Sequence, residues 1–438
     1  MIENIGDWQR SHYSKQLSGG LDGQEVIVMG WVRELRDLGK IKFIKLADRE
    51  GFTQIIAKKD LPAELIEKVK SLGREDVIAV KGKVKASNEA PNGVEIVPSE
   101  IRVLNVSEKP LPLEMETRKT PAELVTRLNV RFLDLRKHEV AAIFCISDSL
   151  KRSFSDYFRK LGFIDLNTPI IVEAAAEGGA TMFSVDYFGK EAYLNQSPQL
   201  YKQMVLASGF DKVNIISRVF RAEPHDTPRH LNELVQMDME EAFIRNDEDV
   251  LKHFDGYLQF AIDNVNKDCA DSLKLLDFKI EGLKFPIKRL AYDNALKELE
   301  KVGISIAWGE DLTPEAEKKL CELFNPILVT KWPSSVKPFY CMKEDDPKYS
   351  KGFDLLLNGT EISSGAQREH RYDELVKNIK EKGLNPEDFS FYLDAFRYGM
   401  PPHGGWSIGL ERLTMTLLKL ANIKEASLFP RTKERLIP

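Results

Sequence analysis

The sequence predicts an α+β protein with an N-terminal β-barrel and a larger domain built on a mostly antiparallel β-sheet flanked by helices. Three observations lead to this prediction. Short runs of β-branched and aromatic residues dominate positions 26–105, a proline-rich stretch follows at 109–113, and extended and helical patterns alternate from there onward. A chain of 438 residues is also too long for one ordinary hydrophobic core, so two or three domains are expected.

The first β-rich stretch has the order strand, strand, strand, helix, strand, strand. The predicted strands are Val26–Leu35, Ile41–Ala47, Phe52–Ala57, Asp76–Ala86 and Val94–Leu104. The helix begins at Pro62 and ends near Leu72, before Gly73. This order is typical of a five-stranded OB barrel, a fold that often binds oligonucleotides, although other small barrels fit the same pattern.

The proline-rich stretch, Lys109-Pro110-Leu111-Pro112-Leu113, predicts an extended linker, because each proline restricts its own backbone and that of the residue before it. We therefore expect a barrel domain at 1–105, a linker at 106–135 and a second domain at 136–438. In the second domain, apolar residues at helical spacing predict a helix over His138–Leu161, which Gly162 ends. Further segments are predicted to be helical at 246–267 and 373–382, and extended at 192–195, 213–220, 234–244, 351–365 and 404–409.

Composition points to a cytoplasmic protein. The longest apolar runs, such as Val140–Ile146, are too short to span a bilayer, and the acidic N-terminal residues are unlike a secretory leader. The four cysteines are scattered, which argues against a disulfide framework or a zinc site. The net charge of −5 does not indicate nucleic-acid binding, but residues 33–59 hold eight basic side chains against four acidic ones, a local excess of +4. Such a run is more often just a solvated face.

Three separate segments combine arginines and carboxylates in ways that suit polyphosphate binding. In residues 220–231, Arg221 and Arg229 stand at the two ends of a strand-to-loop segment, and a guanidinium can grip phosphate with two hydrogen bonds. Glu223 could accept a hydrogen bond from an adenine amino group. The alternative interpretation is a charged surface hairpin.

The second segment, residues 353–370, contains Glu361 and Ser364, oxygen donors at a short spacing that suits Mg²⁺ bridged to a nucleotide. Arg368 follows and could grip a small carboxylate. The alternative interpretation is a solvated strand-to-helix turn.

In the third segment, residues 401–413, glycines allow a ligand to approach the backbone closely, and Arg412 stands at the start of a helix. An arginine there can stack on a purine and reach phosphate. Alone, a glycine-rich turn before a helix favours a purely structural interpretation.

Together the three segments resemble the class II aminoacyl-tRNA synthetases. Their second signature motif is similar to Phe220-Arg221-Ala222-Glu223 with Arg229-His230-Leu231. Their third signature motif is similar to Gly405-Trp406-Ser407-Ile408-Gly409-Leu410-Glu411-Arg412. Gly162–Pro169 resembles the first, which in the family forms a homodimer interface through its helix and strand. An N-terminal OB domain is characteristic of the aspartyl, asparaginyl and lysyl members.

Within this group, three segments resemble the aspartyl enzymes, namely Glu177-Gly178-Gly179-Ala180, Gln196–Lys202 and Ser363–His370. The short path between the second and third motifs resembles the archaeal and eukaryotic type. Charge agrees with this, because Lys202 and Arg368 provide two cations for a substrate carboxylate, and Asp238 could orient them. A neutral amide would leave these cations unpaired, which disfavours asparagine.

The resemblance implies specific roles for individual residues. The aspartate ligands would be Glu177, Gln199, Lys202, Arg221, Asp238, Ser364 and Arg368. The ATP ligands would be Arg221, Glu223, Arg229, His230, Leu231, Glu361, Gly409, Leu410, Glu411 and Arg412. Glu361 and Ser364 would bind Mg²⁺, and Arg221 would be catalytic. One departure is Leu234, where the family often has an aromatic residue that stacks on adenine.

In the barrel, Phe43 and Gln54 match family positions that contact the anticodon, since an exposed aromatic can stack on a base and an amide can read a base edge. For Phe43, a place in the barrel core is the equal alternative. Arg33 and Pro91 lie where the family tunes tolerance of the third anticodon base, so tRNA(Asp) is the expected partner and charging of tRNA(Asn) as well stays open.

The expected reaction is the joining of aspartate to the 3′ end of tRNA through an adenylate made from ATP, with no contact with a membrane. Two alternatives remain open. An asparaginyl-tRNA synthetase would share the fold and the ATP residues but differ in the side-chain pocket. A paralogue that binds RNA without catalysis would not require Arg221, Glu361 and Arg412 together.

Overall fold

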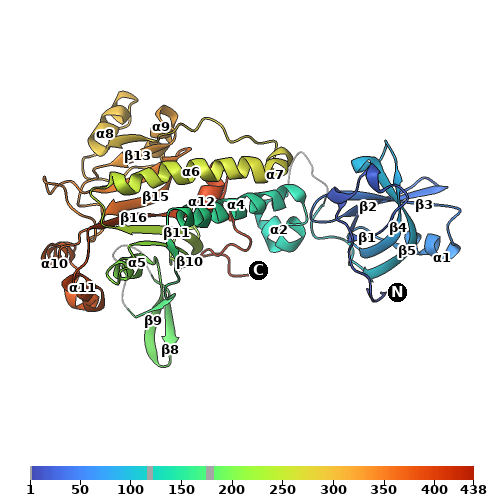
Figure 1. Ribbon diagram of the computed structural model, residues 1–438, viewed down its shortest axis with the longest axis horizontal. Coiled ribbons are helices and arrows are strands. Elements are labelled where there is room, and N and C mark those ends of the chain that lie inside the picture. The colour runs from blue at the N-terminus through green and yellow to red at the C-terminus, as the bar shows by residue number, and fades with distance from the viewer. Residues whose placement is uncertain (1, 116–121, 174–181) are drawn as a thin grey trace. The chain divides into compact units, whose positions relative to one another are not determined.

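A computed structural model describes residues 2–115, 122–173 and 182–438, and the chain divides into two compact units, Met1–Ala141 and Ala142–Pro438 (Figure 1). The predicted linker, 106–135, falls inside the first unit.

The first unit contains a closed five-stranded barrel with the strand order β1-β2-β3-β5-β4. Its elements are β1 (Glu25–Asp37), β2 (Ile41–Ala47), β3 (Phe52–Lys58), α1 (Ala63–Ser71), β4 (Val77–Ala86), β5 (Val94–Asn105) and the short 3₁₀ helices η1 (Ser14–Gln16), η2 (Gly19–Leu21) and η3 (Pro91–Gly93). Alternate residues such as Ile44 and Leu46 point into the barrel core, as the two-residue period of a strand requires. The OB fold predicted from the sequence is confirmed.

The second unit is built on an eight-stranded sheet with the order β12-β13-β14-β15-β16-β11-β10-β6. The strands are β6 (Ile164–Asp165), β10 (Lys212–Phe220), β11 (Glu233–Ala242), β12 (Lys288–Ala291), β13 (Ile327–Thr330), β14 (Gly352–Leu357), β15 (Thr360–Gln367) and β16 (His403–Gly409). Among the described strands of this sheet, only the outermost pairs, β12 with β13 and β10 with β6, are parallel. The sheet is therefore mostly antiparallel, as predicted.

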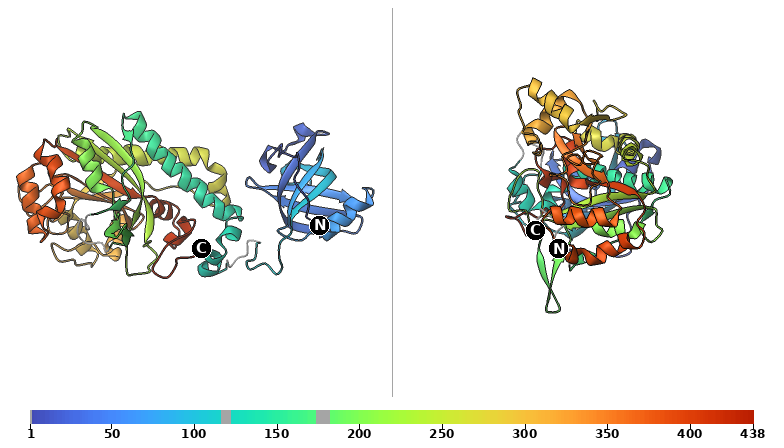
Figure 2. Two further views of the ribbon diagram at one scale, coloured as in Figure 1. Left: turned by 90° about the horizontal axis from the view of Figure 1, so that it is seen from below. Right: turned by 90° about the vertical axis from the view of Figure 1, so that its left-hand side faces the viewer.

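Two long helices cover one face of this sheet. Helices α4 (His138–Lys160) and α6 (Glu248–Asp268) lie side by side in both views (Figures 1 and 2). Their apolar stripes pack on the buried side chains of β11, β14 and β16, where the Trp406 ring stacks on Phe254 at 4.2 Å and its indole N–H donates to the Val250 carbonyl at 3.1 Å. This face is the main hydrophobic core.

Helices α2 (Leu124–Asn129) and α3 (Arg131–Asp134) belong to the first unit. The other elements of the second unit are α5 (Gln199–Leu206), α7 (Ala270–Leu275), α8 (Tyr292–Lys301), α9 (Pro314–Leu323), α10 (Tyr372–Glu381), α11 (Ser390–Arg397), α12 (Leu410–Leu417), the 3₁₀ helices η4 (Pro386–Phe389) and η5 (Ile423–Ala426), and a small sheet of β7 (Ile171–Val172), β9 (Lys190–Leu194) and β8 (Ser184–Tyr187). Among the described residues, no helix is long and apolar enough to cross a membrane.

Strand β11 explains why the second face of the sheet is polar. Met237 and Met239 point into the core beneath α4 and α6, so Gln236, Asp238 and Glu240 must point to the other side. Neighbouring strands continue this division, and the functional site lies on the polar side.

The barrel contains a tight backbone approach that yields a testable prediction. A Cβ atom at Gly82 would lie 2.4 Å from the Val97 carbonyl oxygen, whereas one at Gly19 would meet nothing within 4 Å. We expect Gly82→Ala to destabilise the barrel by about 1–3 kcal/mol through overpacking, and Gly19→Ala to have little effect. Amide hydrogen exchange on barrel peptides measures this, and equal protection in the two variants would contradict it.

Candidate active site

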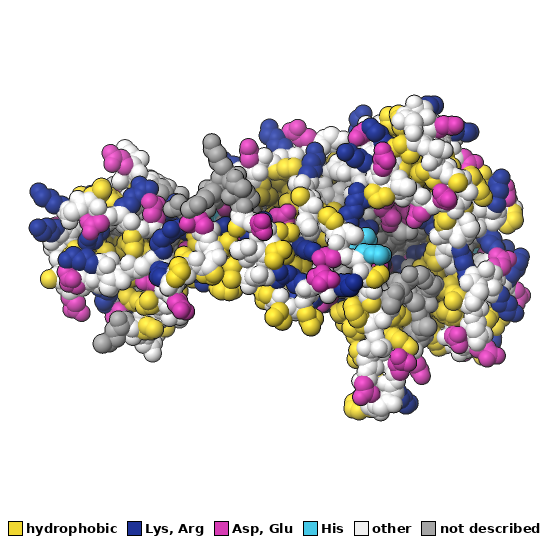
Figure 3. Space-filling model, turned by 180° about the vertical axis from the view of Figure 1, so that it is seen from behind, with side chains coloured by type: hydrophobic (Ala, Val, Ile, Leu, Met, Phe, Trp, Pro, Cys, Tyr) yellow, Lys and Arg dark blue, Asp and Glu magenta, His cyan; other side chains and the backbone are white. Residues whose placement is uncertain are grey.

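A cavity of about 590 Å³ lies over the polar face of the sheet. Its wall includes Arg221 from the end of β10, Glu361 from β15 and Arg412 from α12. The three sequence segments thus meet at one site. In Figure 3, Lys and Arg side chains lie on both sides of a hollow that has histidine side chains at its edge.

Strand register sets the polar face of the sheet beneath this cavity. Asp238 pairs with Ser407, Ser407 with Ser364, and Ser364 with Asp354, so these four residues form one row across β11, β16, β15 and β14. Directly paired residues of antiparallel strands point to the same face. The row therefore brings carboxylates and hydroxyls from four strands to one side of the sheet.

An irregularity in β15 adds Glu361 to this face. Residues three apart on a regular strand point to opposite faces, so Glu361 and Ser364 would be separated. The register between β14 and β15 shifts between Leu355 and Leu356, where Leu355 pairs with Ser363 but Leu356 pairs with Glu361. This bulge turns Glu361 to the same side as Ser364, and both line the cavity.

Arg221 presents an unsatisfied cation to the cavity. It directly follows β10, and the loop after it is held by Asn232, whose amide donates to the Arg221 carbonyl at 2.7 Å. Among the described residues, no acceptor lies within hydrogen-bonding distance of its buried Nε. A buried guanidinium nitrogen without an acceptor indicates a site for an anionic ligand.

The other cationic residues of the cavity are anchored by the protein. Arg412 donates to the Glu361 carbonyl at 3.0 Å, and Arg229 donates to the Glu317 carboxylate at 3.0 Å and to the Gly359 carbonyl at 3.1 Å. Burial, followed by the nearby Arg412, lowers the pKa of His230. A neutral His230 beside arginines is suited to donate a hydrogen bond without adding charge.

Carboxylates gather on the β14–β15 side of the cavity. Burial, and then the neighbouring Asp354, raise the pKa of Glu361 to about 7, and burial also raises that of Glu317. Lys337 pairs with Asp354 at 2.5 Å. No group of three or more His, Cys, Asp or Glu side chains arranged to hold a metal ion occurs among the described residues. Glu361 and Ser364 would thus supply two oxygens and leave the other positions to phosphate and water, which is how Mg²⁺ usually binds beside nucleotides.

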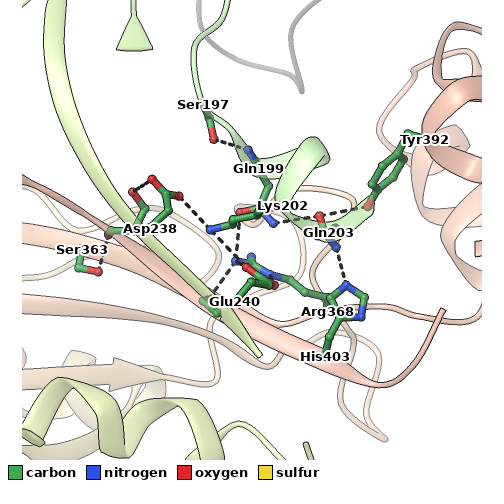
Figure 4. Close-up of polar contacts among 12 residues, drawn as sticks. Ser197, Gln199, Lys202, Gln203, Asp238, Glu240, Ser363, Arg368, Tyr392 and His403 are labelled. Atoms are coloured by element: carbon green, nitrogen blue, oxygen red, sulfur yellow. Dashed lines mark hydrogen bonds and ion pairs between the residues drawn. The ribbon is translucent and has the colours of Figure 1, made fainter. Parts of the chain in front are cut away.

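Four buried charges form a closed cluster at the other end of the cavity (Figure 4). Lys202 on α5 donates to Asp238 at 2.9 Å and lies 3.2 Å from Glu240, while Arg368 grips Glu240 through Nε at 2.8 Å and Nη2 at 3.2 Å. Burial raises the pKa of Asp238, although Lys202 opposes this. Burial also disfavours ionised Glu240, but Arg368 and Lys202 outweigh it and lower the pKa of that group.

Most of the predicted site residues line the cavity, namely Gln199, Arg221, Glu223, Arg229, His230, Leu231, Glu361, Ser364, Arg368, Gly409, Glu411 and Arg412. Lys202 and Asp238 do not line the cavity, because both are fully buried and form an ion pair with each other. Leu410 packs into the core below α4 and α6 instead. Glu177 lies outside the described residues.

Glu411 lines the cavity but is already bonded to the protein. Its two carboxylate oxygens accept from the Val235 N–H at 3.0 and 3.2 Å. It therefore ties the start of α12 to β11, which holds the second and third motif segments together.

Several site residues were missed by the sequence-based prediction. Glu240 stands two residues after Asp238 on one strand, so the strand period itself would have placed it on the same face. Glu317 comes from α9 and Lys337 from the β13–β14 connection, and neither stands in a recognisable motif. Only the fold brings Lys337 to the cavity wall and Glu317 to Arg229, which lines the cavity.

The barrel places two of the four predicted anticodon residues together. Phe43 and Gln54 are half-buried, outside the barrel core, on the neighbouring strands β2 and β3. The core alternative for Phe43 is therefore wrong. Arg33 is not beside them: it is buried and paired with Glu75 at 3.0 Å, so its expected role near the anticodon is not supported by its surroundings. Pro91 lies in η3, directly before β5.

Comparison with known families agrees with this geometry. Residues 123–433 match the class II tRNA synthetases for D, K and N, and residues 26–104 match the OB-fold nucleic acid binding domain. The chain belongs to the class II tRNA synthetase family, and it is an aminoacyl-tRNA synthetase that uses ATP as a substrate.

Its similarity to individual members extends over the whole chain. It is 48% identical to an aspartate–tRNA(Asp/Asn) ligase of Methanothermobacter thermautotrophicus, over 99% of this chain and 100% of the relative. It is 49% identical to an aspartate–tRNA(Asp) ligase of Thermococcus kodakarensis, over 98% and 100%. The asparaginyl-tRNA synthetase of Pyrococcus horikoshii complexed with asparaginyl-adenylate has a similar structure, with a TM-score of 0.93 and 34% identity over 98% and 100% of the two chains.

The state of Glu411 predicts a pH-dependent contribution to stability. Burial raises its pKa to about 7 from 4.5, so the folded state binds a proton more tightly than the unfolded state. The stabilisation is complete below the unfolded pKa and is lost as pH rises through the folded pKa. Glu411→Gln does not titrate, so its stability relative to wild type should improve between about pH 5 and about pH 8. Urea denaturation measures this, with exposed Glu300→Gln as control; a pH-independent difference would contradict it.

Proposed function

We propose that the chain is an aspartate–tRNA ligase, which activates L-aspartate with ATP and transfers it to tRNA. The observation that carries the proposal is the cavity that joins Arg221, Glu361 and Arg412 at one end to the Lys202–Arg368 cluster at the other. The names of the sequence relatives at 48–49% identity support the same substrate.

Arg368 is the main ligand for the side-chain carboxylate of aspartate in this proposal. Its guanidinium lines the cavity, and Lys202 lies beneath it as a second positive charge. Asp238 and Glu240 hold both cations in place. Asparagine would bring no charge to this site and would be a poorer ligand. Glu177 and Gln199 would bind the ammonium group.

The first step is attack of the aspartate α-carboxylate oxygen on the α-phosphorus of ATP. A new oxygen–phosphorus bond forms, the bond to the β-phosphate oxygen breaks, and pyrophosphate leaves. No protein nucleophile or proton transfer is required, because the attacking group is already an anion. The protein must align the reactants and stabilise negative charge, and Arg221 is placed to bridge the carboxylate and the α-phosphate.

Mg²⁺ would be held by Glu361 and Ser364. When bound, it supplies charge neutralisation for the phosphates. Arg229, His230 and Arg412 hold the polyphosphate and purine, and Leu234 provides an apolar surface for the base where the family often has an aromatic ring.

In the second step a terminal ribose hydroxyl of tRNA attacks the carbonyl carbon of the adenylate. The ester bond forms, the bond from that carbon to the phosphate oxygen breaks, and AMP leaves as its phosphate takes up the hydroxyl proton. The family uses the 3′-hydroxyl. Phe43 and Gln54 on the barrel are the proposed contacts for anticodon bases, with tRNA(Asp) as the partner and tRNA(Asn) as a second one.

Two alternatives can be compared with these observations. An asparaginyl-tRNA synthetase is disfavoured by the paired cations Lys202 and Arg368 and by the higher sequence identity to aspartate-specific relatives. A non-catalytic RNA-binding paralogue is disfavoured by the unsatisfied Arg221 Nε in the cavity.

The proposal includes a cytoplasmic homodimer. Around the first motif, the large apolar side chains Leu161, Ile164, Ile170 and Ile171 are exposed. An exposed apolar cluster of this kind is suited to burial against a second copy.

Arg221 provides a direct test of the first step. Arg221→Gln should lower kcat for aspartate-dependent ATP–pyrophosphate exchange by roughly 10²–10³, because one preorganised charge donor is lost. Arg218→Gln is the matched control, since Arg218 is exposed on the same strand and paired with Glu233. Equal rates for the two variants would remove Arg221 from the mechanism.

Phe43 tests the barrel. Phe43→Ala should raise the KM for tRNA about 10-fold through lost base stacking, while ATP–pyrophosphate exchange stays at the wild-type rate. Phe188→Ala, which removes another exposed aromatic side chain from the second unit, is the control. Aminoacylation kinetics measure the effect, and an unchanged KM for tRNA would count against the anticodon contact.

Charging assays with purified tRNA(Asp) and tRNA(Asn) test the proposal as a whole. We expect aspartate to be joined to tRNA(Asp). Aspartate on tRNA(Asn) as well would establish the broader specificity, and no charging of either tRNA would refute the proposed function.

A further inference from the structure

Three fully buried polar side chains lie behind the amino-acid end of the cavity. They are Gln203 on α5, Tyr392 on α11 and His403 at the start of β16, and none of them lines the cavity (Figure 4). They connect three elements that are far apart in the sequence. In a buried network each donor must face an acceptor, so the orientation of every amide and ring can be worked out.

The sequence of donors and acceptors in this network begins at the carbonyl of Pro401, which can only accept a hydrogen bond. It lies 2.8 Å from Nδ1 of His403, so that nitrogen carries the hydrogen. Burial lowers the pKa of His403 to about 4, so the ring is neutral and its Nε2 is an acceptor. The atom of Gln203 that lies 2.8 Å from this nitrogen must therefore be its amide nitrogen.

The amide oxygen of Gln203 then faces away from His403. It accepts from the Tyr392 hydroxyl at 3.1 Å and from the side-chain nitrogen of Gln199 at 2.9 Å. Gln199 must accordingly turn its own amide oxygen toward Arg368, which donates to it through Nη2 at 3.1 Å. A guanidinium can only donate, so Arg368 at one end of this hydrogen-bond network and His403 at the other require the same orientation of Gln199.

This order matters because Gln199 and Arg368 are the two members that reach the cavity. The guanidinium of Arg368 is held from three directions, by Gln199, by Glu240 and by the Gly405 carbonyl at 2.9 Å. If the amide of Gln199 were reversed, its NH₂ group would oppose the donors of Arg368. The guanidinium would then lose one of its three restraints.

We infer that Gln203, His403 and Tyr392 are positioning residues for the amino-acid substrate, which act by fixing the amide direction of Gln199 and, through it, the guanidinium of Arg368. They touch no substrate themselves. This inference rests on the proposed function, because it assigns the amino-acid carboxylate to Arg368.

Position 403 allows a test with two nearly isosteric variants. In His403→Gln, the longer amide can place its oxygen near the position of Nε2 and accept from Gln203. In His403→Asn, the shorter amide keeps a donor for the Pro401 carbonyl but does not reach Gln203. Gln203→Met, which removes the amide at similar volume, is a third variant.

The readouts are the KM values for aspartate and for ATP in ATP–pyrophosphate exchange, with the melting temperature of each variant. We expect His403→Asn and Gln203→Met to raise the KM for aspartate about 10-fold and to leave the KM for ATP within about 2-fold, as lost restraint at one end of the cavity implies. His403→Gln should restore the wild-type KM for aspartate.

Equal aspartate KM values for His403→Asn and His403→Gln would overturn the inference, whether or not Gln203→Met folds. So would a parallel rise of both KM values, because a general structural defect would affect both ends of the cavity. Failure of the proposed function is distinguishable, since wild-type protein would then show no aspartate-dependent exchange at all.

Discussion

The structure of the amino-acid end of the cavity depends on one buried set of charges, formed by Lys202, Arg368, Asp238 and Glu240. Two cations and two carboxylates neutralise each other at distances of 2.8–3.2 Å and join α5, β11 and the segment after β15. Loss of one member would leave an unpaired charge in the interior, at a cost of about 3–5 kcal/mol. The cluster is therefore a constraint on fold and specificity together.

The two ends of the cavity differ in how their charges are satisfied. At the amino-acid end, the protein itself pairs every member of the four-residue cluster and fixes the positions before a substrate arrives. At the nucleotide end, Arg221 keeps a nitrogen without an acceptor among the described residues, and burial, followed by the neighbouring Asp354, raises the pKa of Glu361. The amino-acid end is thus rigid and suited to recognise a small side chain. The opposite end has charges that are suited to bind a polyanion together with a cation.

Much of this could be predicted from the sequence because motifs and strand patterns are local. The barrel strands, the helix before Gly162 and the convergence of Arg221, Glu361 and Arg412 follow from such patterns. The missed features depend on distant contacts. Glu317 reaches the site from α9, the bulge in β15 is set by pairing with β14, and Arg33 is buried because Glu75 pairs with it. Short elements such as β12 and β13 carry too few residues for a clear pattern.

The central claim is that the Lys202–Arg368 cluster selects a negatively charged amino acid. The most direct measurement is the ratio of kcat/KM for aspartate to that for asparagine in ATP–pyrophosphate exchange by the wild-type protein. Because Arg368 would make charge-assisted hydrogen bonds to the aspartate carboxylate that a neutral amide does not make, we expect a preference for aspartate of roughly 10³. Comparable values for the two amino acids, or a preference for asparagine, would contradict the account.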